Sequence, residues 1–136
     1  MINTLILFVS GIIIAAGLDY VWIGHAFGSF YKTEIGALGR TVAGQFSPDL
    51  LAGIGVYVLM SIGVIAFVLP KVGDGGYAKA LALGALWGLI LGGVYELTNY
   101  SMLAGWSGKL VLLDMFWTML SGALTSMLLL ALSRAL

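Results

Sequence analysis

Residues 50–69 read LLAGIGVYVLMSIGVIAFVL and contain no charged side chain. A helix needs about 20 predominantly apolar residues to cross the hydrocarbon core of a bilayer, so this stretch predicts a transmembrane helix. Immediately before it, Ser47, Pro48 and Asp49 are typical of a helix start: a serine cap, a proline in the first helical position and an acid near the positive end of the helix dipole. Pro70 and the glycines that follow predict a tight turn after the span.

Three other stretches have the same character. Residues 2–24, 81–100 and 110–132 are each long and apolar enough to span a membrane. Short polar turns separate the second, third and fourth spans, and short connections make sequential helices antiparallel neighbours. The sequence therefore predicts an all-α membrane protein, a four-transmembrane-helix bundle that forms a single domain over residues 1–136.

The composition agrees with this fold and excludes several functions. Hydrophobic residues make up 61% of the chain and charged residues only 9%, against roughly 25% charged residues in soluble domains. Six basic residues balance six acidic ones without forming a basic cluster, so nucleic acid is not an expected partner. The chain has no cysteine, which excludes disulfide scaffolds, thiolate metal sites and cysteine nucleophiles. The expected surroundings are a lipid bilayer.

The segment between the first two spans, at about residues 26–46, has a different pattern. Its apolar side chains recur at helical spacing, while charged and polar residues interrupt them. This pattern predicts an amphipathic interfacial helix lying in the membrane surface. The apolar positions are Phe27, Phe30, Tyr31, Ile35, Leu38 and Val42.

The basic residues do not fix the orientation of the bundle. Three lie on the side of the first and third loops and three on the side of the second loop, so the positive-inside rule has no asymmetry to act on. Two topologies stay open: a single one with cytoplasmic termini, and a dual one with antiparallel homodimers of inverted protomers. The six residues are Lys32, Arg40 and Lys109 on one side and Lys71, Lys79 and Arg134 on the other.

Three acidic residues lie inside the expected spans: Asp19, Glu96 and Asp114. At ~1.5 Å per residue, Asp19 and Asp114 each lie about 7 to 8 Å inside their helix ends. Glu96 lies roughly 25 Å along the third helix from Lys79, at a similar level. Because the helices alternate in direction, we expect the three acids to converge at one depth, near the face that carries the first and third loops.

Helical periodicity predicts that these acids face the interior of the bundle. Gly84, Gly88, Gly92 and Glu96 follow at intervals of four, a small-residue stripe that permits close helix packing. The stripe also offers a surface through which two copies could form a homodimer. Polar stripes on the other helices should face the same interior; they are Asp114, Thr118, Ser121 and Thr125 on the fourth span and Gly53, Tyr57 and Ser61 on the second.

A buried charge costs about 2.5 to 3.5 kcal/mol even on permissive insertion scales, and the spans contain no basic residue. The acids must therefore be protonated, bind a cation or contact water. A ligand- or proton-binding site is the leading hypothesis; an alternative is that the acids only hydrogen-bond across helices. The site residues we predict are Asp19, Glu96 and Asp114, with Asn99, Tyr95, Tyr57, Trp22, Tyr31 and Trp117 around them.

Other chemistry finds little support. The chain has no nucleophile elbow, zinc-protease, Walker or dinucleotide motif, so the sequence leans against an enzyme, and no cofactor is predicted. The only histidine, His25, stands at a helix end, and a structural role is the simpler interpretation. Two further functions stay open, an intramembrane lipid-acting enzyme or accessory subunit and a structural interaction protein.

Four segments carry a family resemblance. They are DYVWIG at residues 19–24, FYKTEIG at residues 30–36, YELTNY at residues 95–100 and DMFW at residues 114–117, with Trp106 between the last two. Together they resemble the bacterial membrane family named domain of unknown function 2177. The resemblance implies a small four-helix protein of the bacterial inner membrane without an established activity. Glu96 departs from the aspartate that is usual in that family.

Overall fold

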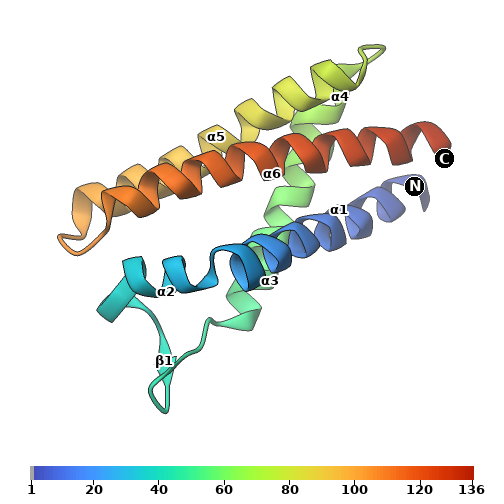
Figure 1. The fold of residues 1–136 in the computed structure, drawn as a ribbon. Coiled ribbons are helices and arrows are strands. Elements are labelled where there is room, and N and C mark those ends of the chain that lie inside the picture. Colours follow the sequence, from blue (N-terminus) through green and yellow to red (C-terminus); the bar gives the residue numbers. More distant parts are fainter. Residues whose placement is uncertain (1) are drawn as a thin grey trace.

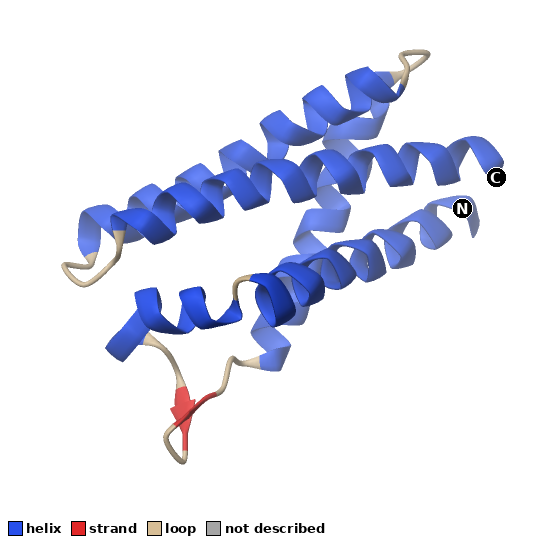
Figure 2. Ribbon diagram, viewed as in Figure 1, coloured by secondary structure: helices blue, strands red, loops and turns tan. Residues whose placement is uncertain are grey.

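The computed structural model describes residues 2–136. Helices dominate the chain, and a small β-hairpin lies between the first and second spans (Figures 1 and 2). The elements are α1 (Ile2–Val21), the π-helical turn η1 (Trp22–Ala26), α2 (Gly28–Ile35), the 3-10 turn η2 (Gly36–Leu38), β1 (Thr41–Val42), β2 (Gln45–Phe46), α3 (Leu50–Gly63), the π-helical turn η3 (Val64–Val68), α4 (Leu69–Val72), α5 (Tyr77–Met102) and α6 (Gly108–Ala135).

Four helical stretches are long and apolar enough to cross a membrane, which confirms the predicted fold class. They are Ile2–Ala26, Leu50–Val72, Tyr77–Met102 and Gly108–Ala135. Each extends beyond the predicted limits, because helices end at capping signals and not where hydropathy falls. The second span, for example, continues through Pro70 to Val72. The π-helical turn η3 ends at Val68, and the backbone N–H of Leu69 bonds the Val64 carbonyl. This shifted hydrogen-bonding pattern suits Pro70, which has no backbone N–H.

The spans are arranged unevenly around the interior. Antiparallel α5 and α6 lie side by side along their length and form the most extensive helix contact, while α1 runs beside α6 (Figure 1). The α3–α4 span passes behind them in this view and contacts α1. The two termini lie at one end of the molecule, and α2 and the α5–α6 turn lie at the other.

The close approach of α5 and α6 depends on the predicted glycine stripe. A Cβ atom at Gly84 would overlap the carbonyl oxygen of Gly122, and one at Gly88 or Gly92 would overlap Thr118. All three stripe glycines are buried. α6 of the same chain occupies the stripe on which the predicted homodimer rested.

An aliphatic cluster and the three acids lie toward opposite ends of the interior. At the end nearest the second loop, a cluster of fully or nearly fully buried aliphatic side chains closes the bundle. The three acids of the interior lie farther along the helices, toward the first and third loops. The cluster consists of Val64, Val68, Val72, Ala80, Leu129 and Leu130.

The segment between the first two spans is helical only in its first half. α2 ends at Ile35, and Gly36 follows with φ of 52°, a left-handed conformation that suits glycine. Residues Thr41–Val42 and Gln45–Phe46 then pair as antiparallel strands around a two-residue turn, in which Ala43 and Gly44 both have positive φ. The prediction of a helix as far as residue 46 is wrong beyond η2, because the helical spacing of Leu38 and Val42 arose without a buried face; Val42 is 68% exposed.

The second span is capped by Asp49 and not by Ser47. The Asp49 carboxylate accepts a hydrogen bond of 2.9 Å from the backbone N–H of Ala52 and pairs with Arg40 at 3.1 Å. Ser47 instead donates its backbone N–H to the Arg40 carbonyl and belongs to the hairpin. The hydrogen bond from Ala52, and then the nearby Arg40 charge, lower the pKa of Asp49 below its ordinary value.

Candidate functional site

Asp19 joins three helices near the end of the first span. Its carboxylate accepts a hydrogen bond of 2.7 Å from the indole N–H of Trp117 on α6. The Tyr57 hydroxyl of α3 lies close to the same carboxylate. Trp117 is only 6% exposed, so these contacts lie inside the bundle.

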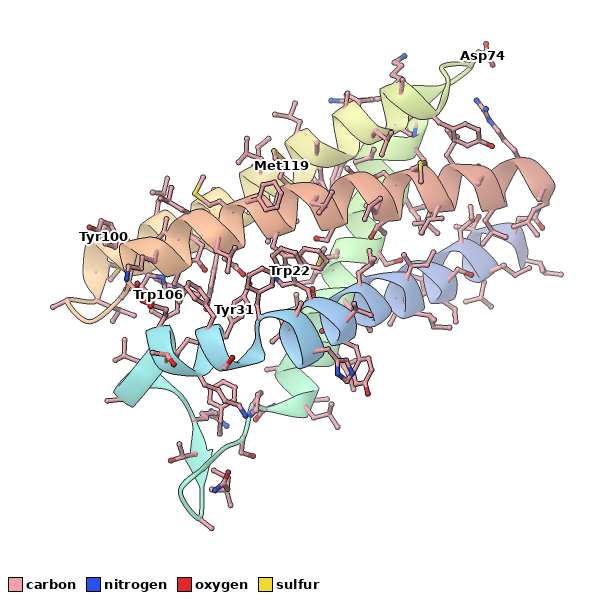
Figure 3. All side chains as sticks on the ribbon, in the orientation of Figure 1. Trp22, Tyr31, Asp74, Tyr100, Trp106 and Met119 are labelled. Carbon is pink, nitrogen blue, oxygen red and sulfur yellow. The ribbon has the colours of Figure 1, made fainter. Side chains whose placement is uncertain are left out.

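Aromatic rings form one wall beside Asp19. Trp22 stacks on Trp117 with ring centroids 4.3 Å apart and planes 7° from parallel, and Phe27 packs 4.2 Å from Trp22. The π-helical turn η1, which begins at Trp22, carries this ring into the space between α1 and α6 (Figure 3). Within residues 2–136 the buried indole N–H of Trp22 makes no hydrogen bond, although the Tyr31 hydroxyl lies nearby.

Tyr31 connects α2 to the acid on the fourth span. Its hydroxyl donates a hydrogen bond of 2.6 Å to Asp114 Oδ1, and the residue is 7% exposed. Burial, followed by the neighbouring Asp114 carboxyl, raises the pKa of Tyr31 above its ordinary value. Tyr31 therefore remains a neutral donor, and it holds α2 against the end of the bundle.

Glu96 is the most deeply buried of the three acids, with 1% of its surface exposed. Its carboxylate accepts a hydrogen bond of 2.7 Å from the indole N–H of Trp106 in the third loop. The Asp114 carboxyl lies beside that of Glu96, close enough for the two groups to hydrogen-bond when one holds a proton. Glu96 and Asp114 thus form a carboxyl pair between α5 and α6.

Within the part of the chain that the structure describes, no cationic side chain forms an ion pair with an acid of this site. Across residues 2–136 the one salt bridge joins Arg40 to Asp49, outside the spans. The same residues contain no group of three or more histidine, cysteine, aspartate or glutamate side chains that could hold a metal ion. The acids are held by neutral donors: Trp117 for Asp19, Trp106 for Glu96 and Tyr31 for Asp114.

Comparison with known proteins assigns the family. Residues 4–131 match the family described as a predicted membrane protein, domain of unknown function 2177. The chain belongs to this family. No curated protein and no solved structure is significantly similar to it. The matched region of this family member contains all the site residues described above.

Seven of the nine predicted site residues converge in this family member, and the other two, Tyr95 and Asn99, lie at the edge of the site. Tyr95 is 57% exposed and lies with Asn99 on the outer surface of α5. With Val94 and Thr98 they line a shallow surface cavity of about 380 Å³. Tyr95 lies at the edge of the buried face of α5, with its ring edge-on to Trp106 at a centroid distance of 6.1 Å, and Asn99 is half-buried three residues after Glu96. Within residues 2–136 neither side chain bonds one of the three acids. The seven that converge are Asp19, Trp22, Tyr31, Tyr57, Glu96, Asp114 and Trp117.

Sequence reasoning missed the residues that complete the site from the loops. Trp106 bonds Glu96, and the Ser107 hydroxyl donates to Glu34 of α2. A backbone hydrogen bond of 2.9 Å from Trp106 to Leu103 folds this loop back over the end of α5. Periodicity assigns directions along a helix but not in a loop, so residue spacing could not place Trp106 beside Glu96.

Proposed function

We propose that this protein is a membrane binding or transport protein whose interior carboxyl groups take up a proton and exchange it for a small cationic or polar ligand. The exchange occurs at the Glu96–Asp114 pair. Asp19 adds a third acceptor nearby, and the ligand enters from the face that carries the first and third loops.

The observation that carries the proposal is the carboxyl pair without a basic partner. Glu96 is buried, Asp114 lies beside it, and their hydrogen-bond donors are the neutral Trp106 and Tyr31. Two adjacent carboxylates in a poorly solvated site repel each other, and burying uncompensated charge is costly. A proton shared by the pair, or a bound cation, removes that cost.

The aromatic residues suit an organic ligand better than a metal ion. The indole N–H of Trp22 is buried with no hydrogen-bond partner in the described part of the chain, so it can donate to a polar ligand. The stacked rings of Trp22 and Trp117 offer π faces of the kind that attract ammonium groups. An organic ammonium ion would thus find a carboxyl pair and an aromatic wall in one place.

Access would depend on α2. Tyr31 bonds Asp114 and Glu34 bonds Ser107, so α2 is fastened over the carboxyl pair by two side-chain hydrogen bonds. The π-helical turn at Trp22–Ala26 interrupts the regular helix just before α2, and such turns often occur at functional sites. Release of the two bonds would let α2 swing away as a lid.

Transport would require a second opening. The cluster of Val64, Val68, Leu129 and their neighbours closes the interior toward the second loop. Ligand exchange in this conformation is therefore one-sided. A transport cycle would have to separate α3–α4 from α6 at this cluster.

The test uses the fluorescence of Trp106, which contacts Glu96. Purified protein is titrated from mildly acidic to mildly alkaline pH, with and without an alkylammonium salt. We expect the fluorescence of the wild type to change with pH. The midpoint of this change should move to lower pH when the ammonium ion competes with the proton. Glu96→Gln should abolish the change, whereas Asp74→Asn, in the exposed second loop, should leave it intact. A change that persists in Glu96→Gln would remove Glu96 from the proposal.

A structural role is the competing function, because each acid already accepts a hydrogen bond from another segment of the chain. In that case Glu96→Gln would lower the thermal unfolding midpoint but leave the response to alkylammonium unchanged. Measuring stability and binding on the same variant separates the two functions.

A further inference from the structure

A second cavity lies on the outer surface, between α2 and α6. It has a volume of about 490 Å³ and is lined by Phe27, Phe30, Lys109, Leu112, Leu113 and Phe116. None of the three interior acids lines it. This groove is therefore separate from the carboxyl pair and needs its own explanation.

The groove combines an apolar wall with one positive charge at its end. Lys109 is the second residue of α6, where the span meets the interface, and its side chain is exposed. Within residues 2–136 it forms no salt bridge, since the one ion pair joins Arg40 to Asp49. Lysine at such a position extends its ammonium group toward the headgroup region.

This arrangement matches the chemistry of a phospholipid. An acyl chain is apolar along its length, as are the five remaining lining residues, and the phosphate would lie at the level of Lys109. Basic residues next to a span attract anionic lipids, by an amount equivalent to about a fivefold preference for each residue. A zwitterionic lipid would bind less tightly, because Lys109 repels the positive charge of its headgroup.

We propose that the groove between α2 and α6 binds one anionic phospholipid, with its phosphate on Lys109 and an acyl chain along Phe27, Phe30 and Phe116. The lipid would lie against the outer side of α2. It would therefore brace the helix that covers the carboxyl pair, without touching the acids.

The test uses brominated lipids, which quench nearby tryptophans. Trp22 lies 4.2 Å from Phe27 and 6.4 Å from Phe116, centroid to centroid, so it reports on this groove. The protein is reconstituted in phosphatidylcholine vesicles containing a small share of brominated phosphatidylglycerol or, separately, brominated phosphatidylcholine. We expect the anionic lipid to quench with about fivefold higher apparent affinity, and the difference to shrink at high salt.

Variants test which residues cause the preference for the anionic lipid. Lys109→Gln should abolish the preference for the anionic lipid, whereas Lys71→Gln, an exposed lysine of the other face, should preserve it. Trp22→Phe should remove most of the quenching specific to the anionic lipid. Equal quenching by both lipids in the wild type, or a preference that survives in Lys109→Gln, would overturn the proposal. The proposal would also be overturned if quenching by both lipids decreased as the protein density in the vesicles increased. A second copy of the chain would then occupy the groove.

Discussion

At the scale of single residues, the site depends on neutral donors that hold carboxyl groups without neutralising them. The indoles of Trp106 and Trp117 and the hydroxyl of Tyr31 each donate one hydrogen bond to a different acid. A lysine or arginine in their place would fix a carboxylate in its charged form. Neutral donors orient the acids without fixing them in the charged form, which suits the proposed exchange of a proton for a cation.

The Tyr31–Asp114 bond should contribute measurably to stability. Tyr31→Phe removes the donor and leaves a part-buried carboxyl with one partner fewer, so we expect the free energy of unfolding to fall by about 1 to 3 kcal/mol. The measurement is denaturant unfolding in detergent micelles. Tyr20→Phe is the matched control, because Tyr20 is 67% exposed and its hydroxyl makes no hydrogen bond within residues 2–136. An equal loss in both variants would contradict the assigned bond.

At the scale of elements, the faces of the helices could be predicted from the sequence, whereas the structure of the loops could not. Periodicity correctly turned Glu96 and the stripe glycines inward, because a helix face is fixed by residue spacing alone. It could not show that α6 would occupy that face, nor that Tyr95 would be largely exposed. Trp106 was placed by the fold of a five-residue loop, and the hairpin by positive φ at Ala43 and Gly44, neither of which has a periodic signal.

The contact between α5 and α6 can be tested with glycine substitutions. Gly88→Ala would drive a Cβ into the backbone of Thr118, and such overpacking typically costs about 1 to 3 kcal/mol. Gly17→Ala, on α1, meets no atom within 4 Å and should be neutral or stabilise by up to about 1 kcal/mol through helix propensity. The measurement is again denaturant unfolding in micelles. A Gly88→Ala variant as stable as Gly17→Ala would rule out the close packing described.

The start of α3 should depend on pH in a defined direction. The pKa of Asp49 is lowered in the folded protein, so its contribution to stability is present above the unfolded value of about 3.9 and is lost as pH falls through the folded value. Hydrogen exchange of the first turn of α3 should accelerate, relative to intrinsic rates, as the solution becomes strongly acidic. Asp49→Asn, which caps without titrating, should flatten this response. If Asp49→Asn shows the same pH dependence of hydrogen exchange as the wild type, another group causes that dependence.

At the scale of the whole molecule, the acids lie toward the first and third loops, and an aliphatic cluster lies toward the second. The carboxyl pair and its aromatic wall occupy one half, and the aliphatic cluster around Val64 and Leu129 seals the other. Such an interior suits the one-sided access that we propose for the ligand. Which side faces the cytoplasm depends on an orientation that the balanced basic residues do not specify.

Cysteine labelling can settle that orientation, because the chain has no native cysteine. Single cysteines at the exposed positions Gln45, Gly105 and Asp74 are labelled with a membrane-impermeant thiol reagent in intact cells. With one topology and cytoplasmic termini, Gln45→Cys and Gly105→Cys should react from outside and Asp74→Cys should not. Partial labelling at all three positions would instead indicate dual topology.

The central claim is that Glu96 and Asp114 share an exchangeable proton, and infrared spectroscopy of the purified protein tests it most directly. A protonated carboxyl group has a C=O stretching band that a carboxylate lacks. We predict that the wild type shows this band at neutral pH, loses it at alkaline pH, and that Glu96→Gln abolishes the change while Asp74→Asn preserves it. A wild-type spectrum without a protonated carboxyl band, or an identical pH response in Glu96→Gln, would contradict the claim.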